Sequence, residues 1–267
     1  HPLQVEAVAW ISAYKTLLGG LLALTALWLY LIYAQSSQAD KPRPVYYWLA
    51  TLSYVLGLLS QPATVVVPVV AGIIDWRLLR RSGRRVIVNL GLWCVCALPI
   101  AIIGKLAQPD TVLEFIPDLR QRILIAGDAL TFYLGKLLLP LGLGVDYGRT
   151  PQMVVASEWT WLSGLLPYGI VVILLIKFRR SLSLVLVILF ISALLPVLGL
   201  VPFFFQIIST VADRYIYLAM LAPALAMGYG WSAAPSRRYR IAAAVLLVVL
   251  AGISARQTGY WHDSATL

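Results

Sequence analysis

Charged side chains are scarce in this chain. Only 12% of its 267 residues are Asp, Glu, Lys or Arg, and 61% are hydrophobic, whereas an ordinary soluble domain has about 25% charged residues. A soluble domain of this length would need more polar surface, and a disordered chain would be far more polar. The composition therefore excludes a cytosolic globular enzyme and a disordered segment, and it predicts a polytopic membrane protein.

Alternation between polar and apolar residues is also missing. A transmembrane β-barrel would show a period of two along short strands, but here the apolar residues form continuous blocks. We therefore expect an all-α membrane bundle of about eight spans, with interfacial helices on its extracytoplasmic side. The expected spans are 17–34, 46–60, 63–76, 86–104, 160–176, 182–200, 216–232 and 241–255.

Cysteine and histidine are rare, at two residues each. Cys94 and Cys96 are two positions apart in an apolar run, so on a helix they would point to different faces and pack rather than form a disulfide. His1 and His262 are too few for a histidine metal cluster. The chain also contains no Walker loop, no His-Glu-x-x-His motif and no nucleophile elbow. We therefore assign no metal ligands from these motifs.

Acidic residues are fewer than basic ones, and the net charge is +10. In a soluble protein this excess would indicate a nucleic-acid partner, but most of the basic residues here lie in four short loops between apolar blocks. Short basic loops remain in the cytoplasm, so the charge reports topology and we expect no nucleic-acid partner. The loops contain Lys41 and Arg43; Arg77, Arg80, Arg81, Arg84 and Arg85; Lys177, Arg179 and Arg180; and Arg237, Arg238 and Arg240.

The long segment 105–159 is expected on the opposite, extracytoplasmic side. The basic loops on either side of it are both predicted to be cytoplasmic, and the two spans that flank it already account for the crossings between them. Within it, the apolar stretch 120–140 carries Asp128 and Lys136, which are costly in hydrocarbon. We therefore expect this stretch to be an interfacial helix lying along the membrane.

The unusual polar residues collect on the extracytoplasmic side. Glu6, at the edge of an apolar helix, would be a general base or a metal ligand, or else a solvated acid at a helix end. Asp213 and Arg214 meet where a loop enters a span. Arg214 would bind a phosphate with Asp213 orienting it, or the two would form a structural ion pair with Tyr215 and Tyr217 as interfacial anchors.

Two further residues on this side are candidates. Lys136 would bind a lipid phosphate or extend toward water. Gln61, followed by Pro62, would break a helix at the outer surface and leave either a re-entrant pair or two short tilted helices. The predicted spans themselves contain almost no ionisable side chain, which argues against a proton-coupled transporter.

Five stretches, in their order and spacing, resemble one protein family. They are His1 to Ser12; Leu59 to Pro62, with Pro68 and Asp75-Trp76 downstream; Tyr133 to Leu137, ending at Pro140; Ala212 to Leu218; and Arg256 to Ser264. The chain resembles the membrane domain of tetratricopeptide-repeat proteins related to the transmembrane O-mannosyltransferases, which belong to the GT-C superfamily. The resemblance implies transfer of a sugar, with inversion, from a polyprenyl-phosphate donor to an acceptor such as a protein hydroxyl or a glycan.

The resemblance also implies roles for single residues. Arg214 and Lys136 would hold the donor phosphate, with Lys15 assisting. Asp213 would orient Arg214, and Glu6 would position the acceptor, a divalent metal or the catalytic loop. The other substrate-orienting residues would be His1, Gln61, Tyr215 and Tyr217.

The same resemblance predicts the organisation and location of the protein. Residues 1–255 would form the membrane domain, and 256–267 would lead into a tetratricopeptide-repeat domain beyond Leu267. Further spans and a first outer loop, which carries the main catalytic acid in this family, would precede His1. The protein would lie in a bacterial inner membrane, in contact with its lipids, with the active face toward the periplasm.

Three positions depart from the family pattern. Gln4 stands where the family has histidine, Thr16 where it has an acid, and Gln61 where it has lysine. These losses keep open an alternative function, a non-catalytic membrane anchor for extracytoplasmic repeats. A transporter of a lipid-linked substrate is the second alternative, and it would need a polar cavity continuous across the bilayer.

Overall fold

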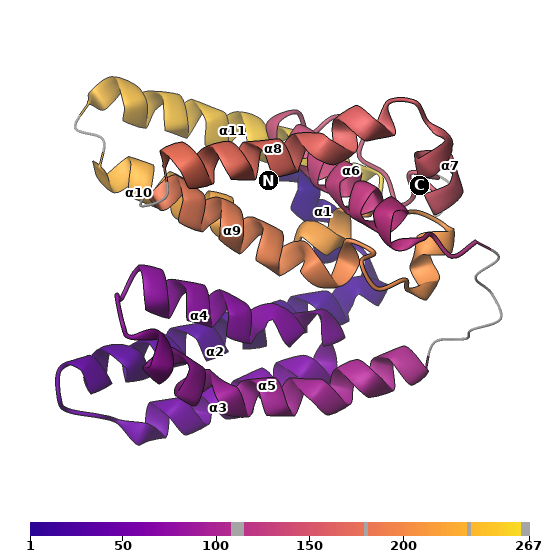
Figure 1. Ribbon diagram of the computed structural model, residues 1–267. Coiled ribbons are helices and arrows are strands. Elements are labelled where there is room, and N and C mark those ends of the chain that lie inside the picture. Colours follow the sequence, from indigo (N-terminus) through magenta and orange to yellow (C-terminus); the bar gives the residue numbers. More distant parts are fainter. Residues whose placement is uncertain (108–114, 179–180, 234–235, 263–267) are drawn as a thin grey trace. The chain divides into compact units, whose positions relative to one another are not determined.

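The computed structural model describes residues 1–107, 115–178, 181–233 and 236–262, and it is helical without strands throughout these ranges (Figure 1). Arg179 and Arg180, two of the basic residues in the predicted cytoplasmic loops, lie outside these ranges. The chain divides into two compact units. One comprises His1–Tyr14 with Thr111–Leu267, and the other Lys15–Asp110.

Each of the eight expected apolar blocks contains a helix. They are α2 (Tyr14–Gln38), α3 (Pro44–Ser60), α4 (Val67–Arg77, after the 3-10 turn η3, Pro62–Val66), α5 (Gly83–Leu106), α8 (Thr160–Lys177), α9 (Leu182–Leu194, continued by η5, Leu195–Val197), α10 (Leu221–Ala233) and α11 (Arg237–Gly259). Several of these helices begin at residues that favour a helix start. Pro44 lies in the first turn of α3, and the side chains of Ser181 and Ser236 cap the N-termini of α9 and α11.

Four helices in the described ranges are long and apolar enough to cross a membrane. They are Ile11–Gln38, Gly83–Leu106, Thr160–Lys177 and Arg237–Gly259. A helix needs about 20 apolar residues to span the hydrocarbon core, and α3, α4, α9 and α10 are shorter than this. The structure thus supports an integral membrane protein. A total of about eight spans stays a prediction.

The unit Lys15–Asp110 is built from α2 to α5 around buried aromatic rings. Tyr54 stacks on Trp93 with ring centroids 4.7 Å apart, and the indole Nε1 of Trp93 donates to Thr51 Oγ1 at 2.9 Å. The helices α3 and α4 are separate, because the extended backbone of Gln61 ends α3. The break predicted at Gln61 is therefore present, and whether the two helices form a re-entrant pair or two short tilted helices stays a prediction.

One basic residue of the predicted cytoplasmic loops is buried. Arg81 is only 6% exposed, and its guanidinium donates to Asp75 Oδ2 at 3.0 Å. The same oxygen accepts a 2.6 Å hydrogen bond from the Tyr30 hydroxyl. Arg81 is therefore neutralised by Asp75 within the fold, and it adds less to the positive charge of this loop than the sequence indicates.

The segment 120–140 forms one helix, α6 (Leu119–Leu138), which begins with a capping box at Asp118. It packs against α8 at a crossing of two glycines, since a Cβ atom on Gly127 would overlap the carbonyl group of Gly164. The Tyr168 hydroxyl donates to the Ile123 carbonyl at 2.8 Å beside this crossing. The partner of α6 in the fold is therefore α8, while an interfacial position in the membrane stays a prediction.

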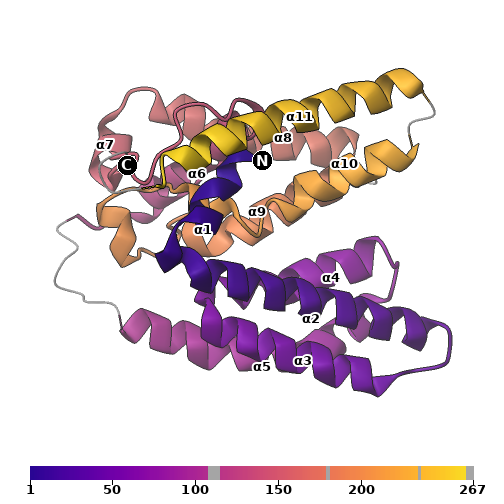
Figure 2. The same cartoon turned by 180° about the vertical axis from the view of Figure 1, so that it is seen from behind.

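Short helices complete the unit formed by His1–Tyr14 and Thr111–Leu267. The 3-10 turn η1 (Pro2–Gln4) and helix α1 (Val5–Ala9) lie against α11 and against the 3-10 turn η7 (Asp213–Ile216), and Figure 2 shows α1 beside α11. The rings of Trp10 and Trp261 are 6.1 Å apart at this contact. A further 3-10 turn, η6 (Phe204–Ile207), follows α9, and α7 (Pro151–Ala156) precedes α8. The N-terminal segment therefore contacts both α11 and η7.

Candidate functional site

Glu6 and Arg214 form an ion pair between α1 and η7. Glu6 Oε1 accepts the guanidinium Nη1 of Arg214 at 2.6 Å, and Glu6 Oε2 accepts the backbone N–H of Arg214 at 2.7 Å. Glu6 is only 2% exposed, and burial raises its pKa, although the positive charge of Arg214 opposes this. Both carboxylate oxygens are therefore engaged by one residue, and Glu6 holds η7 and the Arg214 side chain together.

Arg214 lies among aromatic rings. Its guanidinium carbon is 5.0 Å from the ring centroid of Tyr215, 5.3 Å from Trp10 and 5.9 Å from Phe205. Cations within about 6 Å of a ring are attracted by its quadrupole. The side chain keeps 19% of its exposure, so the charge is fixed in place by Glu6 and the rings but is still open to solvent on one side.

Asp213, next in sequence to Arg214, has a different partner. It is 3% exposed, and its Oδ1 accepts the Tyr147 hydroxyl at 2.8 Å. Burial raises the pKa of Asp213 to about 7, with the nearby Glu6 carboxylate acting in the same direction, whereas the Tyr147 hydrogen bond and Lys136 lower it. The residue that orients Arg214 is Glu6, so the structure differs here from the role expected for Asp213.

Lys136 lies near the C-terminal end of α6. Its Nζ donates to the carbonyls of Leu141 at 2.5 Å and Gly142 at 2.9 Å, and it lies 5.1 Å from the ring centroid of Tyr147. An ammonium group has three donors, so one N–H remains beyond these two carbonyls. Tyr147 therefore contacts both Lys136, through its ring, and Asp213, through its hydroxyl.

The N-terminal residues lie in the same unit. The His1 Nε2–H donates to the Leu137 carbonyl at 3.2 Å, one residue after Lys136, while His1 Nδ1 accepts the Leu3 N–H. Gln4 Nε2 donates to the Tyr217 carbonyl at 3.5 Å. His1 and Tyr217 are thus brought to this region by contacts to the backbone, and a part for either side chain in substrate binding stays a prediction.

Lys15 and Gln61 belong to the other unit. Lys15 has an exposed side chain, and its backbone carbonyl accepts the Ser60 hydroxyl at 3.2 Å. Gln61 packs closely against Gly19 of α2, since a Cβ atom added to Gly19 would lie 2.5 Å from the Gln61 Cβ. A part for Lys15 or Gln61 in donor binding stays a prediction.

We name the group Glu6, Lys136, Tyr147, Asp213 and Arg214 the outer cluster. It contains two cations, a carboxylate already paired with Arg214, and a second carboxylate, Asp213. A carboxyl group that titrates near neutral pH can accept or release a proton in a reaction. The cluster therefore has the components of an acid–base and anion-binding site.

Sequence reasoning missed Tyr147. It lies in a loop, 139–150, in which Gly142 and Gly148 both have positive φ angles, of 57° and 59°. Such angles favour glycine, so the spacing of these glycines was a signal that the loop has a defined shape. Nothing in the sequence connects the tyrosine to Asp213, because the two are 66 residues apart.

The outer cluster does not offer a metal site. No group of three or more His, Cys, Asp or Glu side chains that could hold a metal is found in the described part of the chain, and both oxygens of Glu6 bind Arg214. The interpretation of Glu6 as a metal ligand does not fit this arrangement.

No protein-family model, curated protein or solved structure matches this chain. Membership of the GT-C superfamily is therefore a proposal that depends on the sequence motifs and the outer cluster.

Proposed function

We propose that this chain is the membrane domain of a GT-C glycosyltransferase with about eight spans, which transfers a sugar from a polyprenyl-phosphate donor to an acceptor hydroxyl on the extracytoplasmic side of the membrane. The observation that carries the proposal is the outer cluster, in which a buried carboxyl group, Asp213, lies with the cations Arg214 and Lys136. The motifs that resemble the family contain both cations and Asp213.

The reaction places distinct demands on these groups. The acceptor oxygen forms a bond to the anomeric carbon, the bond from that carbon to the phosphate oxygen breaks, and the lipid phosphate leaves with the electron pair. Arg214 and Lys136 would stabilise the charge that develops on the phosphate. Asp213 would accept the proton of the hydroxyl, or share that task with an acid outside this chain segment. Glu6 would act indirectly, by fixing Arg214.

The test is sugar transfer in liposomes by the full-length protein, with radiolabelled polyprenyl-phosphate sugars as donors. Arg214→Ala should abolish transfer, and Lys136→Ala should reduce it strongly. Arg238→Ala, which changes an exposed arginine at the predicted cytoplasmic side, is the control and should retain activity. Thermal unfolding of each variant checks that it is folded. Absence of transfer by the unaltered protein from every donor would overturn the proposal.

A specific observation favours the second candidate, a non-catalytic membrane anchor for extracytoplasmic repeats. The guanidinium of Arg214 is already bound by Glu6, and Lys136 by two backbone carbonyls, as in a purely structural cluster. An anchor predicts that Arg214→Ala lowers the melting temperature while no version of the protein transfers sugar.

A further inference from the structure

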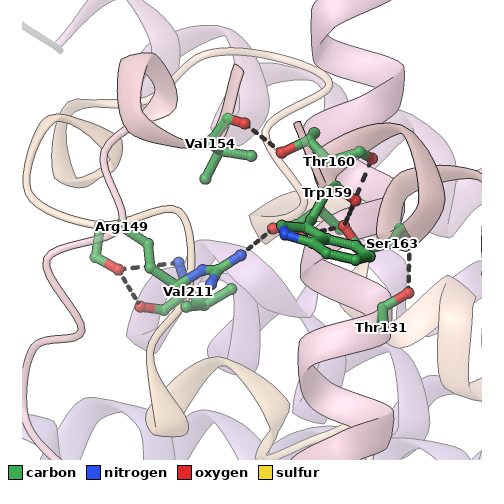
Figure 3. Close-up of polar contacts among 9 residues, drawn as sticks. Thr131, Arg149, Val154, Trp159, Thr160, Ser163 and Val211 are labelled. Atoms are coloured by element: carbon green, nitrogen blue, oxygen red, sulfur yellow. Dashed lines mark hydrogen bonds and ion pairs between the residues drawn. The ribbon is translucent and has the colours of Figure 1, made fainter. Parts of the chain in front are cut away.

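The loop 139–150 is fastened to the rest of its unit through Arg149. The Arg149 guanidinium forms an ion pair with Asp128 Oδ2 on α6, and its backbone carbonyl accepts the Thr210 N–H at 2.8 Å. Figure 3 shows the Arg149 side chain extending toward Ser163. The loop is therefore held by a side chain on one side and by the backbone on the other.

Asp128 is the centre of this attachment. Its side chain is only 6% exposed, and its second oxygen, Oδ1, accepts the Ser163 hydroxyl from the first turn of α8 at 2.7 Å. The Thr131 hydroxyl donates to the Ser163 carbonyl beside it, as Figure 3 shows. A buried carboxylate is costly unless it is paired and hydrogen-bonded, and Asp128 meets both conditions. Asp128 thus joins α6, α8 and the loop at one point.

A row of contacts connects this point to the outer cluster. The Arg149 guanidinium lies 5.6 Å from the ring centroid of Phe132. The Phe132 ring meets the Tyr147 ring edge-on at 4.7 Å, and the Tyr147 hydroxyl donates to Asp213 Oδ1. The ring of Tyr147 thus contacts both the Phe132 ring and the cation of Lys136, which itself lies 5.4 Å from the Phe132 ring centroid.

We propose that Tyr147 is a positioning residue that keeps the Asp213 carboxyl group in the charged form, which can accept a proton. We propose further that the Asp128–Arg149 pair holds the Tyr147 side chain in position. The importance of Tyr147 for turnover rests on the function proposed above, but its effect on Asp213 does not. Among the described residues, the other titratable groups that face Asp213 are Glu6 from α1, Lys136 and Tyr133 from α6, and Arg214 from η7.

The physical reason is a balance between burial and hydrogen bonding. Burial disfavours the charged carboxylate and raises the pKa of Asp213, whereas a hydrogen bond from the Tyr147 hydroxyl favours the charged form and lowers it. Removing the hydroxyl therefore raises the pKa further. Asp213 would then hold its proton at neutral pH and could not accept one from the acceptor.

The variant Tyr147→Phe tests this directly, because it removes only the hydroxyl and keeps the ring that contacts Phe132 and Lys136. Isotope-edited infrared spectroscopy of the full-length protein, labelled at aspartate, follows the C=O band of the protonated carboxyl group, and Asp213→Asn identifies that band. In Tyr147→Phe the titration midpoint of the band should move to higher pH by about one unit. An unchanged midpoint would overturn the proposal.

A matched control and a remote variant separate a specific effect of the Tyr147 hydroxyl on Asp213 from a general effect of mutations in this unit. Tyr168→Phe removes a tyrosine hydroxyl that donates to the Ile123 carbonyl of α6 and not to Asp213. This variant should leave the titration midpoint unchanged. Arg149→Gln should move the midpoint in the same direction as Tyr147→Phe, although Arg149 does not touch Asp213. If Arg149→Gln has no effect, the part of the proposal that concerns the Asp128–Arg149 pair is wrong.

The activity readout is independent of the spectroscopic one. If the protein transfers sugar, the acid limb of the pH profile of kcat should shift to higher pH in Tyr147→Phe, with KM nearly unchanged. If it does not transfer sugar, the proposed function fails, while the infrared midpoint still decides whether Tyr147 controls Asp213.

Discussion

The carboxylate of Glu6 binds Arg214 twice, at the guanidinium and at the backbone N–H, across 208 residues of sequence. The second bond satisfies an N–H at the start of η7, where no earlier carbonyl is available within the helix. One carboxylate therefore fixes both the backbone and the charge of the same arginine, and it connects the N-terminal segment to the loop that follows α9.

Glu6→Gln should destabilise the protein. The amide keeps the size of the side chain and can still accept the backbone N–H, but the partly buried guanidinium loses its counter-charge. Loss of one partner from a buried pair costs roughly 3–5 kcal/mol, and we expect about 2 kcal/mol because Arg214 retains some exposure. Thermal unfolding in detergent measures the change. Glu158→Gln, at an exposed acid, is the control, and an equal effect of both variants would contradict the prediction.

Stability should depend on pH through Asp213. Its pKa is about 7 in the folded protein and has an ordinary value of 3.8, so between these values the folded state holds a proton that the unfolded state has released. Stability from this residue therefore falls as pH rises through this window and is constant above it. Asp213→Asn should lose less stability between pH 5 and pH 8 than the unaltered protein. Melting temperatures at both values check this, with the exposed Asp40→Asn expected to behave like the unaltered protein.

Gly127→Ala should separate α6 from α8. Its added methyl group would overlap the backbone of Gly164, which cannot move aside as a flexible side chain would. Overpacking of this kind costs about 1–3 kcal/mol. Gly135→Ala, on the same helix with nothing within 4 Å of the new atom, should be neutral or slightly stabilising. Denaturant unfolding of both variants measures the difference, and similar stabilities would show that the crossing tolerates a side chain.

The topology can be tested by cysteine labelling. In a variant without Cys94 and Cys96, a cysteine introduced by Arg84→Cys should be protected from a membrane-impermeant maleimide in intact cells, because its loop is predicted to be cytoplasmic. A cysteine introduced by Glu158→Cys should react, since 105–159 is predicted to be extracytoplasmic. Both side chains are exposed in the structure. Labelling in the reverse pattern would invert the orientation and place the outer cluster on the cytoplasmic side.

The positions of the helices could be predicted from the sequence. Each of the eight apolar blocks contains a helix, because a long apolar run is a local property and its backbone must satisfy its own hydrogen bonds in a membrane. Helix ends were less well predicted where they depend on shape. The block 216–232 starts earlier than α10, since the chain first forms η7 at Asp213–Ile216.

The pairing of charges could not be predicted in the same way. Sequence adjacency suggested that Asp213 orients Arg214, but successive side chains on a 3-10 helix diverge by about 120°. Asp213 therefore binds Tyr147 while Arg214 binds Glu6. From the sequence alone, Asp128 indicated only that its segment would be costly to place in the membrane. In the structure its charge is paired with that of Arg149.

By itself, the sequence determined that this is an integral membrane protein, where its helices lie, and which acids and cations to consider as a site. These conclusions depend on hydropathy and charge, which each segment carries alone. Only the tertiary structure decided which acid fixes Arg214, that Tyr147 belongs to the outer cluster, and that Asp213 has the raised pKa. Those properties arise from burial and from contacts between distant segments, and they exist only once the segments have packed together.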